Sequence, residues 1–321
     1  MSGIKITGTG LGIPTRVVTN EDMAQIVDTN EEWILTRTGI STRHHLAEGE
    51  TITGMTVQAA REALDHAGVS PEEIGVCIVA TLTPDTLVPS AACMVQKELG
   101  LAHDTICFDL NAACTGFLYA LHTTECLLGA ARKKFGLVIG AENLSRITNW
   151  EDRGTCILFG DGAGAAVVEW NENYPSVRAV LGCHGEDEML RVPGVETGRR
   201  SLISMEGTKV FKFAIQAVPY CVEEILNRFS MKPEDVDFYV FHQANARIID
   251  AAVKRYQIPP EKVYKNIQNY GNTSAASIPL VLGELQAKGR IGVGDRVLVV
   301  GFGGGLTWGG ALVEFAERTQ K

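Results

Sequence analysis

The sequence lacks the features that mark membrane, secreted and disordered proteins. In its 321 residues there is no run of about eighteen apolar residues without polar interruption, so no membrane partner is expected. The opening residues, MSGIKITGTGLG, carry no basic segment followed by a long apolar run, which favours a cytoplasmic location. No charged or low-complexity block indicates a disordered tail, and we expect a globular enzyme with two halves of similar size.

Metal-binding and nucleic-acid-binding patterns are also missing. The eight cysteines stand singly, without a CxxC pair or Cys/His ligand spacing, so we expect reduced thiols and no metal site. The net charge of −9 repels nucleic acid over the whole surface. An acidic protein partner would therefore need a local basic patch.

Short β-branched runs alternate with helix-like stretches along the chain. Residues 76–81 (VCIVAT) and 135–142 (FGLVIGAE) are typical of buried strands, whereas residues 116–131 (GFLYALHTTECLLGAA) have helical character. This is an α/β pattern. Because NENYP at 171–175 interrupts it, we expect an N-terminal half over residues 1–170 and a C-terminal half over residues 171–321.

The second half repeats the first in outline, which indicates an internal duplication. The run from 263 to 305 matches the strand, turn, helix, strand order of 105–142. In that register Cys114 and Asn272 hold equivalent places, each just after a strand and near the start of a helix. Paired βαβ halves bring strand ends and helix starts to one crevice.

Cys114 is a candidate nucleophile because it precedes an amphipathic helix. There the helix dipole and the unpaired backbone N–H groups favour thiolate over thiol. A buried, inert thiol is nevertheless the commoner role of any single cysteine. His242, at the end of an apolar run, has a structural alternative as a hydrogen-bonded group, and Asn272 has one as a turn or cap residue.

A glycine run, GFGGGLTWGGALVEF at 301–315, follows a strand-like segment. Its glycines permit close backbone approach, so its N–H groups can point at an anion and form an oxyanion hole. A phosphate loop is the alternative. It is disfavoured because GxxxxGK[ST] is absent and the run leads into a strand rather than a helix.

With these residues in hand, the chain resembles beta-ketoacyl-acyl-carrier-protein synthase III, a condensing enzyme of the thiolase-fold superfamily that initiates bacterial fatty-acid synthesis. The resemblance implies a thiolase-like fold whose two duplicated halves form a five-layered αβαβα sandwich, and a homodimer. The segments that carry it are EEWILTRTGI (31–40), NAACTGF (111–117), ENLSRITNWEDRGTCILFGDGAGA (142–165), VFKFA (210–214), FHQAN (241–245), NYGNTSAASIP (269–279) and GFGGGLTWG (301–309).

The resemblance implies a catalytic triad of Cys114, His242 and Asn272, with the backbone N–H groups of Cys114 and Gly304 as the oxyanion hole. In the family the cysteine takes an acyl group from acyl-CoA. Malonyl-acyl-carrier protein then loses carbon dioxide, and the enolate attacks the acyl-cysteine. Acyl-CoA is a substrate, and no cofactor is expected.

Two further sets of residues follow from the resemblance. Arg247, Lys254 and Arg255 have the helical spacing of one basic face, to which Lys212 adds, and the resemblance favours this face as the docking site of the acidic carrier protein. The implied CoA path consists of Thr29, Trp33, Arg37, Arg153, Phe211, Ala244 and Asn245.

The acyl pocket departs from the family. Val88 stands before Pro89, where the family often has a bulky aromatic residue, so a roomier pocket and longer or branched primers are expected. If this loop crosses a dimer interface, Leu87 and Val88 shape the acyl site of the partner. The segment 184–202 is either a mobile cover or a plain surface loop.

Three alternative functions stay open. The first is a related ketide synthase of secondary metabolism, which has the same residues. The second is an acyl-CoA acyltransferase or thioesterase, because a nucleophile and an oxyanion hole suffice for acyl transfer. The third is a non-catalytic module that binds CoA or the carrier.

Overall fold

The structure is a computed structural model that describes residues 2–194 and 201–316. Its first sheet lies in the N-terminal half. Strand β4 is parallel to β5 and β6, while β7 is antiparallel to β1 and β6. The strand order is β1 (Gly3–Gly12), β7 (Gly162–Asn171), β6 (Phe135–Glu142), β4 (Ile74–Ala80) and β5 (Ile106–Leu110).

The second sheet repeats this topology with one strand fewer. Strand β11 is parallel to β12, and β13 is antiparallel to β12 and β8. The strand order is β11 (Phe238–Phe241), β12 (Arg296–Gly303), β13 (Gly305–Glu314) and β8 (Val180–Glu186). All strands of the first sheet precede residue 172 and all strands of the second follow residue 179. The exact division at residue 170 stays a prediction.

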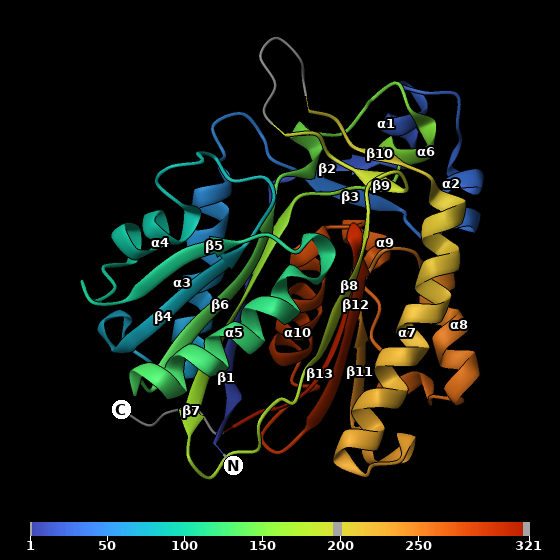
Figure 1. Ribbon diagram of the computed structural model, residues 1–321. Coiled ribbons are helices and arrows are strands. Elements are labelled where there is room, and N and C mark those ends of the chain that lie inside the picture. The colour runs from blue at the N-terminus through green and yellow to red at the C-terminus, as the bar shows by residue number, and fades with distance from the viewer. Residues whose placement is uncertain (1, 195–200, 317–321) are drawn as a thin grey trace.

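Helices fill the space between the two sheets and cover their outer faces (Figure 1). Helices α5 (Gly116–Ala131) and α10 (Ser277–Ala287) lie in the middle. Helices α3 (Ile52–Ala67) and α4 (Ala91–Leu99) cover the first sheet, and α7 (Gly207–Phe229) and α8 (Ala246–Tyr256) cover the second. One apolar cluster joins the central helices to both sheets, and two others lie between each sheet and the helices on its outer face. The predicted five-layered αβαβα sandwich is confirmed.

A cap of short elements lies over one end of both sheets, at the top of Figure 1. Within it, Asn30 accepts the Trp33 backbone N–H at the start of α2, and Gly39, with φ of 79°, ends the helix in the left-handed conformation. These caps fix the short helix that carries Trp33 and Arg37. The cap elements are β2 (Arg16–Thr19), α1 (Asn20–Ala24), α2 (Glu31–Thr38), β3 (Thr42–His45), α6 (Arg153–Cys156), β9 (Leu190–Arg191), β10 (Ser204–Met205) and α9 (Ile267–Tyr270).

The internal duplication is visible in the turns that enter α5 and α10, but its predicted register is wrong. Ala113 and Ser274 both have positive φ, 46° and 50°, and each opens a 3₁₀ turn that runs directly into its helix. Matching these turns aligns Asn272 with Asn111, not with Cys114. The equivalent of Cys114 is Ala275.

The prediction of a full strand before Asn272 is also wrong. Only one bridge, between Tyr239 and Val263, remains where β5 pairs with β4 in the first half, and the short helix α9 follows. The predicted place of Cys114 near the start of a helix is confirmed, because it lies in the 3₁₀ turn Ala113–Thr115, two residues before α5 begins.

Two expectations concern membranes and the 184–202 segment. Of the helices in the described ranges, none combines the length and the apolar character needed to cross a lipid bilayer. Residues 195–200 of the 184–202 segment lie outside the described residues.

Candidate active site

Cys114 is buried where the two sheets meet. Its turn is held by Asn111 Oδ1, which accepts the Ala113 N–H at 3.1 Å. The end of β12 lies directly against it, because a Cβ placed on Gly303 would be 2.8 Å from the Cys114 backbone nitrogen. Glycine is required at this approach. Gly304, the predicted second oxyanion donor, lines a cavity that Cys114 also lines.

His242 follows β11 and enters the same site. Its backbone N–H donates to Val300 O at 2.8 Å, and its ring lies edge-on to Phe302 at 5.3 Å between centroids. Ring atom Nδ1 is 2.6 Å from Ser277 Oγ, which also accepts the Gln243 backbone N–H. Burial lowers the pKa of His242 to about 3, so the imidazole is neutral at physiological pH.

Asn272 has one end of its amide fixed by the backbone. Its Oδ1 accepts the Ser274 N–H at 2.9 Å, while its own backbone N–H donates to Leu158 O at 2.8 Å. The carbonyl oxygen is thereby occupied. The NH₂ group is the end that can donate to a ligand.

The Cys114 thiol does not have the lowered pKa that its place ahead of a helix predicts. Burial, with a smaller effect of the nearby Glu142 carboxyl, raises the pKa of Cys114 to about 12, although Ser274 acts to lower it. The cost of burying the thiolate outweighs the favourable effect of the nearby helix N-terminus. Cys114 is therefore a thiol at rest, and its proton must leave before it can act as a nucleophile.

A cavity of about 510 Å³ joins the three predicted catalytic residues to most of the predicted CoA path. The guanidinium of Arg153 lies 4.7 Å from the centre of the Trp33 ring and that of Arg37 lies 5.8 Å from it, so two guanidinium groups lie close to this ring. The predicted residues that line this cavity are Cys114, His242, Asn272, Trp33, Arg37, Phe211, Ala244 and Asn245.

Thr29 is not among the residues that line this cavity. Its hydroxyl is buried and finds no hydrogen-bond partner within the part of the chain that the structure describes. Its contribution to CoA binding stays a prediction.

A second cavity of about 720 Å³ opens on the other side of Cys114. Leu87 lines it, together with Leu144, Ile147 and Ile203. Val88 does not, and its side chain is 88% exposed. Leu87 therefore borders a cavity of its own chain and Val88 does not, and the predicted role of both residues at the acyl site of a partner stays a prediction.

The predicted basic face on α8 stays a prediction, and its three residues Arg247, Lys254 and Arg255 are all exposed but have different neighbours. The Arg255 guanidinium is bound to Glu223 at 2.9 Å, which neutralises it locally. Arg247 lies over the Phe211 ring at 5.5 Å and lines the cavity that holds the triad. Lys254, on the same helix, is exposed.

Sequence reasoning missed Glu142, Ser274 and Ser277. Glu142 is completely buried at the end of β6, and burial raises its pKa to about 7. The signal was present, because a carboxylate ends the otherwise apolar run FGLVIGAE. Ser274 and Ser277 stood in the quoted motif NYGNTSAASIP, where only Asn272 received a role.

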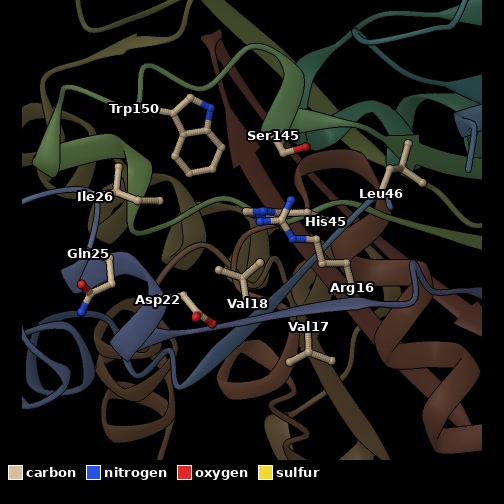
Figure 2. Close-up of a pocket in the computed structure, with 10 residues that line it drawn as sticks. All are labelled: Arg16, Val17, Val18, Asp22, Gln25, Ile26, His45, Leu46, Ser145 and Trp150. Atoms are coloured by element: carbon tan, nitrogen blue, oxygen red, sulfur yellow. The ribbon is translucent and has the colours of Figure 1, made fainter. Parts of the chain in front are cut away.

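A separate cavity of about 600 Å³ lies in the cap, between β2, β3 and the segment that carries Trp150 (Figure 2). Arg16, His45 and Trp150 line it, and none of the predicted site residues does. The His45 ring lies edge-on to Trp150 at 5.5 Å. Across the described ranges, no group of three or more His, Cys, Asp or Glu side chains is arranged to hold a metal ion.

Comparison with known proteins places this geometry in one family. Two models, "3-Oxoacyl-[acyl-carrier-protein (ACP)] synthase III" and its C-terminal counterpart, match residues 108–185 and 226–315. A beta-ketoacyl-[acyl-carrier-protein] synthase III of Clostridium acetobutylicum is 43% identical over 99% of this chain and 100% of its own.

Solved structures agree. The 3-oxoacyl-[acyl-carrier-protein] synthase III of Aquifex aeolicus VF5 superimposes with a TM-score of 0.91 at 46% identity, over 98% of this chain and 100% of that one. The priming beta-ketosynthase of the R1128 polyketide biosynthetic pathway has a TM-score of 0.93 at 34% identity, over 99% and 97%.

Proposed function

The chain belongs to the beta-ketoacyl-acyl-carrier-protein synthase III family of condensing acyltransferases, and from that premise we propose that Cys114 carries the acyl group while His242 and Asn272 stabilise the enolate. The observation that supports this most is that the three residues come together in the folded chain. Three residues from distant parts of the chain line one cavity, between a path suited to CoA and a mostly apolar pocket.

In the first half-reaction the acyl-CoA thioester enters from the side of Trp33. The adenine stacks between Trp33 and Arg153 after the two separate, and Arg37 contacts phosphate. The Cys114 sulfur attacks the thioester carbonyl, whose oxygen accepts from the N–H groups of Cys114 and Gly304. CoA leaves, and the acyl chain occupies the cavity lined by Leu87.

In the second half-reaction a malonyl group on acyl-carrier protein enters by the same path. Loss of carbon dioxide leaves an enolate, which needs hydrogen-bond donors and no charged neighbour. Since Ser277 Oγ accepts the Gln243 N–H, its hydroxyl hydrogen is available to His242 Nδ1, and the ring hydrogen then sits on Nε2. Asn272 supplies the second donor, and the carbanion attacks the acyl-cysteine.

The primer and the pathway follow from the second cavity. We expect primers longer or more branched than acetyl to react, because Leu87 and its apolar neighbours leave about 720 Å³ beside Cys114. Fatty-acid initiation is the favoured role. The likeness to a polyketide priming synthase keeps a specialised ketide pathway as the second candidate. A cytoplasmic homodimer that needs no cofactor completes the proposal.

The test is the intact mass of wild type and Cys114→Ala after brief exposure to acetyl-, butyryl-, isobutyryl- and hexanoyl-CoA, followed by malonyl-acyl-carrier protein. An adduct confined to wild type, discharged as a β-ketoacyl product, supports the proposal and ranks the primers. An adduct released only as free acid indicates a thioesterase. No adduct with any acyl-CoA contradicts a cysteine mechanism, and acetyl-CoA matching the larger primers contradicts the roomier pocket.

A further inference from the structure

Glu142 is a buried carboxyl group for which the mechanism above has no use. It ends β6, has no exposed surface and forms no ion pair with any residue in ranges 2–194 and 201–316. Burying a carboxyl without a cation is costly, and groups placed in this way are frequent at functional sites.

Hydrogen-bond donors surround this carboxyl. Oε2 accepts from Thr83 Oγ1 at 2.6 Å, from the Leu82 backbone N–H at 3.2 Å and from Thr81 Oγ1 at 3.4 Å. Oε1 accepts from Ser274 Oγ at 3.2 Å. One oxygen is therefore anchored to the segment after β4, and the other faces the turn that enters α10.

Ser274 links Glu142 to the nucleophile. Ser274 also lowers the pKa of the Cys114 thiol through its side chain, and both residues line the cavity of about 720 Å³. The turn itself does not require a hydroxyl at position 274. Ala113 occupies the matching position in the other half with nearly the same φ, 46° against 50°, and has no hydroxyl.

A proton acceptor for Cys114 is needed and is not supplied by the triad. Asn272 cannot take a proton at neutral pH, and His242 with its hydrogen on Nε2 presents a donor to the site. Glu142 is the carboxyl that reaches the thiol, through one hydroxyl. A proton-acceptor role for Glu142 rests on the proposed acylation of Cys114.

We propose that Ser274 and Glu142 form a relay that removes the Cys114 proton during acyl transfer and returns it after condensation. The S–H bond breaks as Ser274 Oγ takes that proton and passes its own to Glu142 Oε1. The sulfur then bonds to the acyl carbon, and the CoA thiolate leaves and takes a proton from water.

The reverse transfer closes the cycle. When the carbanion attacks, the carbon–sulfur bond breaks and the pair of electrons stays on Cys114 as thiolate. Glu142 gives its proton to Ser274, which gives one to the sulfur. Glu142 holds the proton through the life of the acyl-enzyme, and acts on the reacting sulfur through Ser274.

The charged neighbours of the relay are few. Cys114 faces Glu142 from the turn before α5. Arg146 donates to the carbonyls of Thr83 and Pro84, and Asp161, directly before β7, accepts the N–H and hydroxyl of Ser145. These contacts leave the carboxyl of Glu142 unpaired, and its pKa of about 7 puts its ionisation in the working range.

The experiment measures the rate of Cys114 acylation by butyryl-CoA in single turnover, from pH 5 to pH 9, for wild type, Glu142→Gln, Glu142→Asp and Ser274→Ala. For wild type, the acylation rate should increase with pH and show an inflection near pH 7. Glu142→Gln and Ser274→Ala should lose that inflection, fall about 100-fold at pH 8 and match wild type at pH 5, where Glu142 is already protonated. Glu142→Asp should restore most of the rate.

The outcomes separate the relay from a structural role. A merely structural loss would lower the rate equally at all pH values. If both variants keep the wild-type inflection, the relay is wrong, even if their rates fall. If Glu142→Gln does not fold, Ser274→Ala is the deciding variant. An alanine is tolerated in this backbone conformation, because Ala113 adopts it in the other half. Absence of acylation in wild type would instead refute the proposed function.

Discussion

Asn111 and Asn272 form the same hydrogen bond to the backbone in the two halves but have different neighbours. Each accepts the N–H of the residue two positions later, at 3.1 Å and 2.9 Å, and so fixes a left-handed residue at the start of a turn. Only Asn272 lies in the cavity shared with His242 and the CoA path. Its amide oxygen therefore holds the turn, whereas its NH₂ group is the end that we propose donates to the enolate, and a substitution can separate the two.

Asn272→Asp should keep the turn and lose condensation. A carboxylate oxygen still accepts the Ser274 N–H, but the other oxygen repels the enolate instead of donating to it. We expect malonyl decarboxylation and condensation to fall about 100- to 1,000-fold while acylation of Cys114 persists. Single-turnover mass spectrometry measures both steps. Asn269→Asp, at an exposed position on the neighbouring helix α9, is the control, and equal losses in both steps would contradict the assignment.

Glu142 also predicts how stability changes with pH. Its pKa is raised from 4.5 to about 7, so the folded protein binds this proton more tightly than the unfolded chain does. The stabilisation is full below pH 4.5 and is lost as the pH rises through 7, by an amount of about 3 kcal/mol.

Glu142→Gln should therefore gain stability relative to wild type as the pH rises from 5 to 8, by about 2–3 kcal/mol. Urea unfolding at several pH values measures the difference. Ser274→Ala, which retains the carboxyl, should show no such gain. A difference between Glu142→Gln and wild type that stays constant with pH would mean that Glu142 is not titrating in this range.

At the scale of elements, periodicity predicted long, regular segments well and irregular ones poorly. The helix expected at residues 116–131 is α5, and the strand expected at 135–142 is β6. Their boundaries follow from flanking turns and apolar runs. The strand expected between residue 263 and Asn272 rests on a complete duplication, yet only Val263 forms a bridge there, with Tyr239.

The spacing of charged residues along one helix also could not predict which of them form ion pairs. Arg255 has the period of the basic face of α8, but Glu223 on α7 holds its guanidinium at 2.9 Å. Sequence distance gave no sign of that partner. Lys254, exposed on α8, is the better candidate for contact with an acidic carrier.

Lys254→Glu should weaken the second half-reaction alone. We expect kcat/KM for malonyl-acyl-carrier protein to fall about 10-fold at low salt and less at high salt, because an attractive charge becomes repulsive and salt screens both. Acylation by acyl-CoA should not change. Steady-state assays at two salt concentrations measure this effect, with Lys97→Glu on α4 as the matched control. An equal loss in the Lys97 variant would show that net charge, not docking, is responsible.

At the scale of the whole molecule, the residues of the site were predictable and their mutual register was not. Cys114, His242 and Asn272 stand in recognisable motifs, and the α/β alternation predicts that strand ends meet. The alignment of the two halves depends on the backbone conformation at Ala113 and Ser274, which residue identity alone does not reveal. Glu142 was missed for a similar reason, since its partners come from segments far apart in the chain.

The first sheet ends in an edge that has apolar side chains beside it. Strand β5 is the last in its order, and Ile106 on it is 37% exposed. Leu87 and Val88, in the segment before α4, are 75% and 88% exposed. Apolar side chains this exposed near an unpaired strand edge are typical of an interface, and they fit the expected homodimer.

Val88→Asp should therefore weaken association between two copies of the chain. A charge at a buried interface position has no water and no partner, so we expect the dimer dissociation constant to rise at least about 10-fold. Sedimentation equilibrium over a range of concentrations measures it. Val293→Asp, at a position 64% exposed on the loop before β12, is the matched control and should leave association unchanged. A Val88→Asp protein as dimeric as wild type would remove this segment from the interface, and the acyl cavity would then belong to one chain alone.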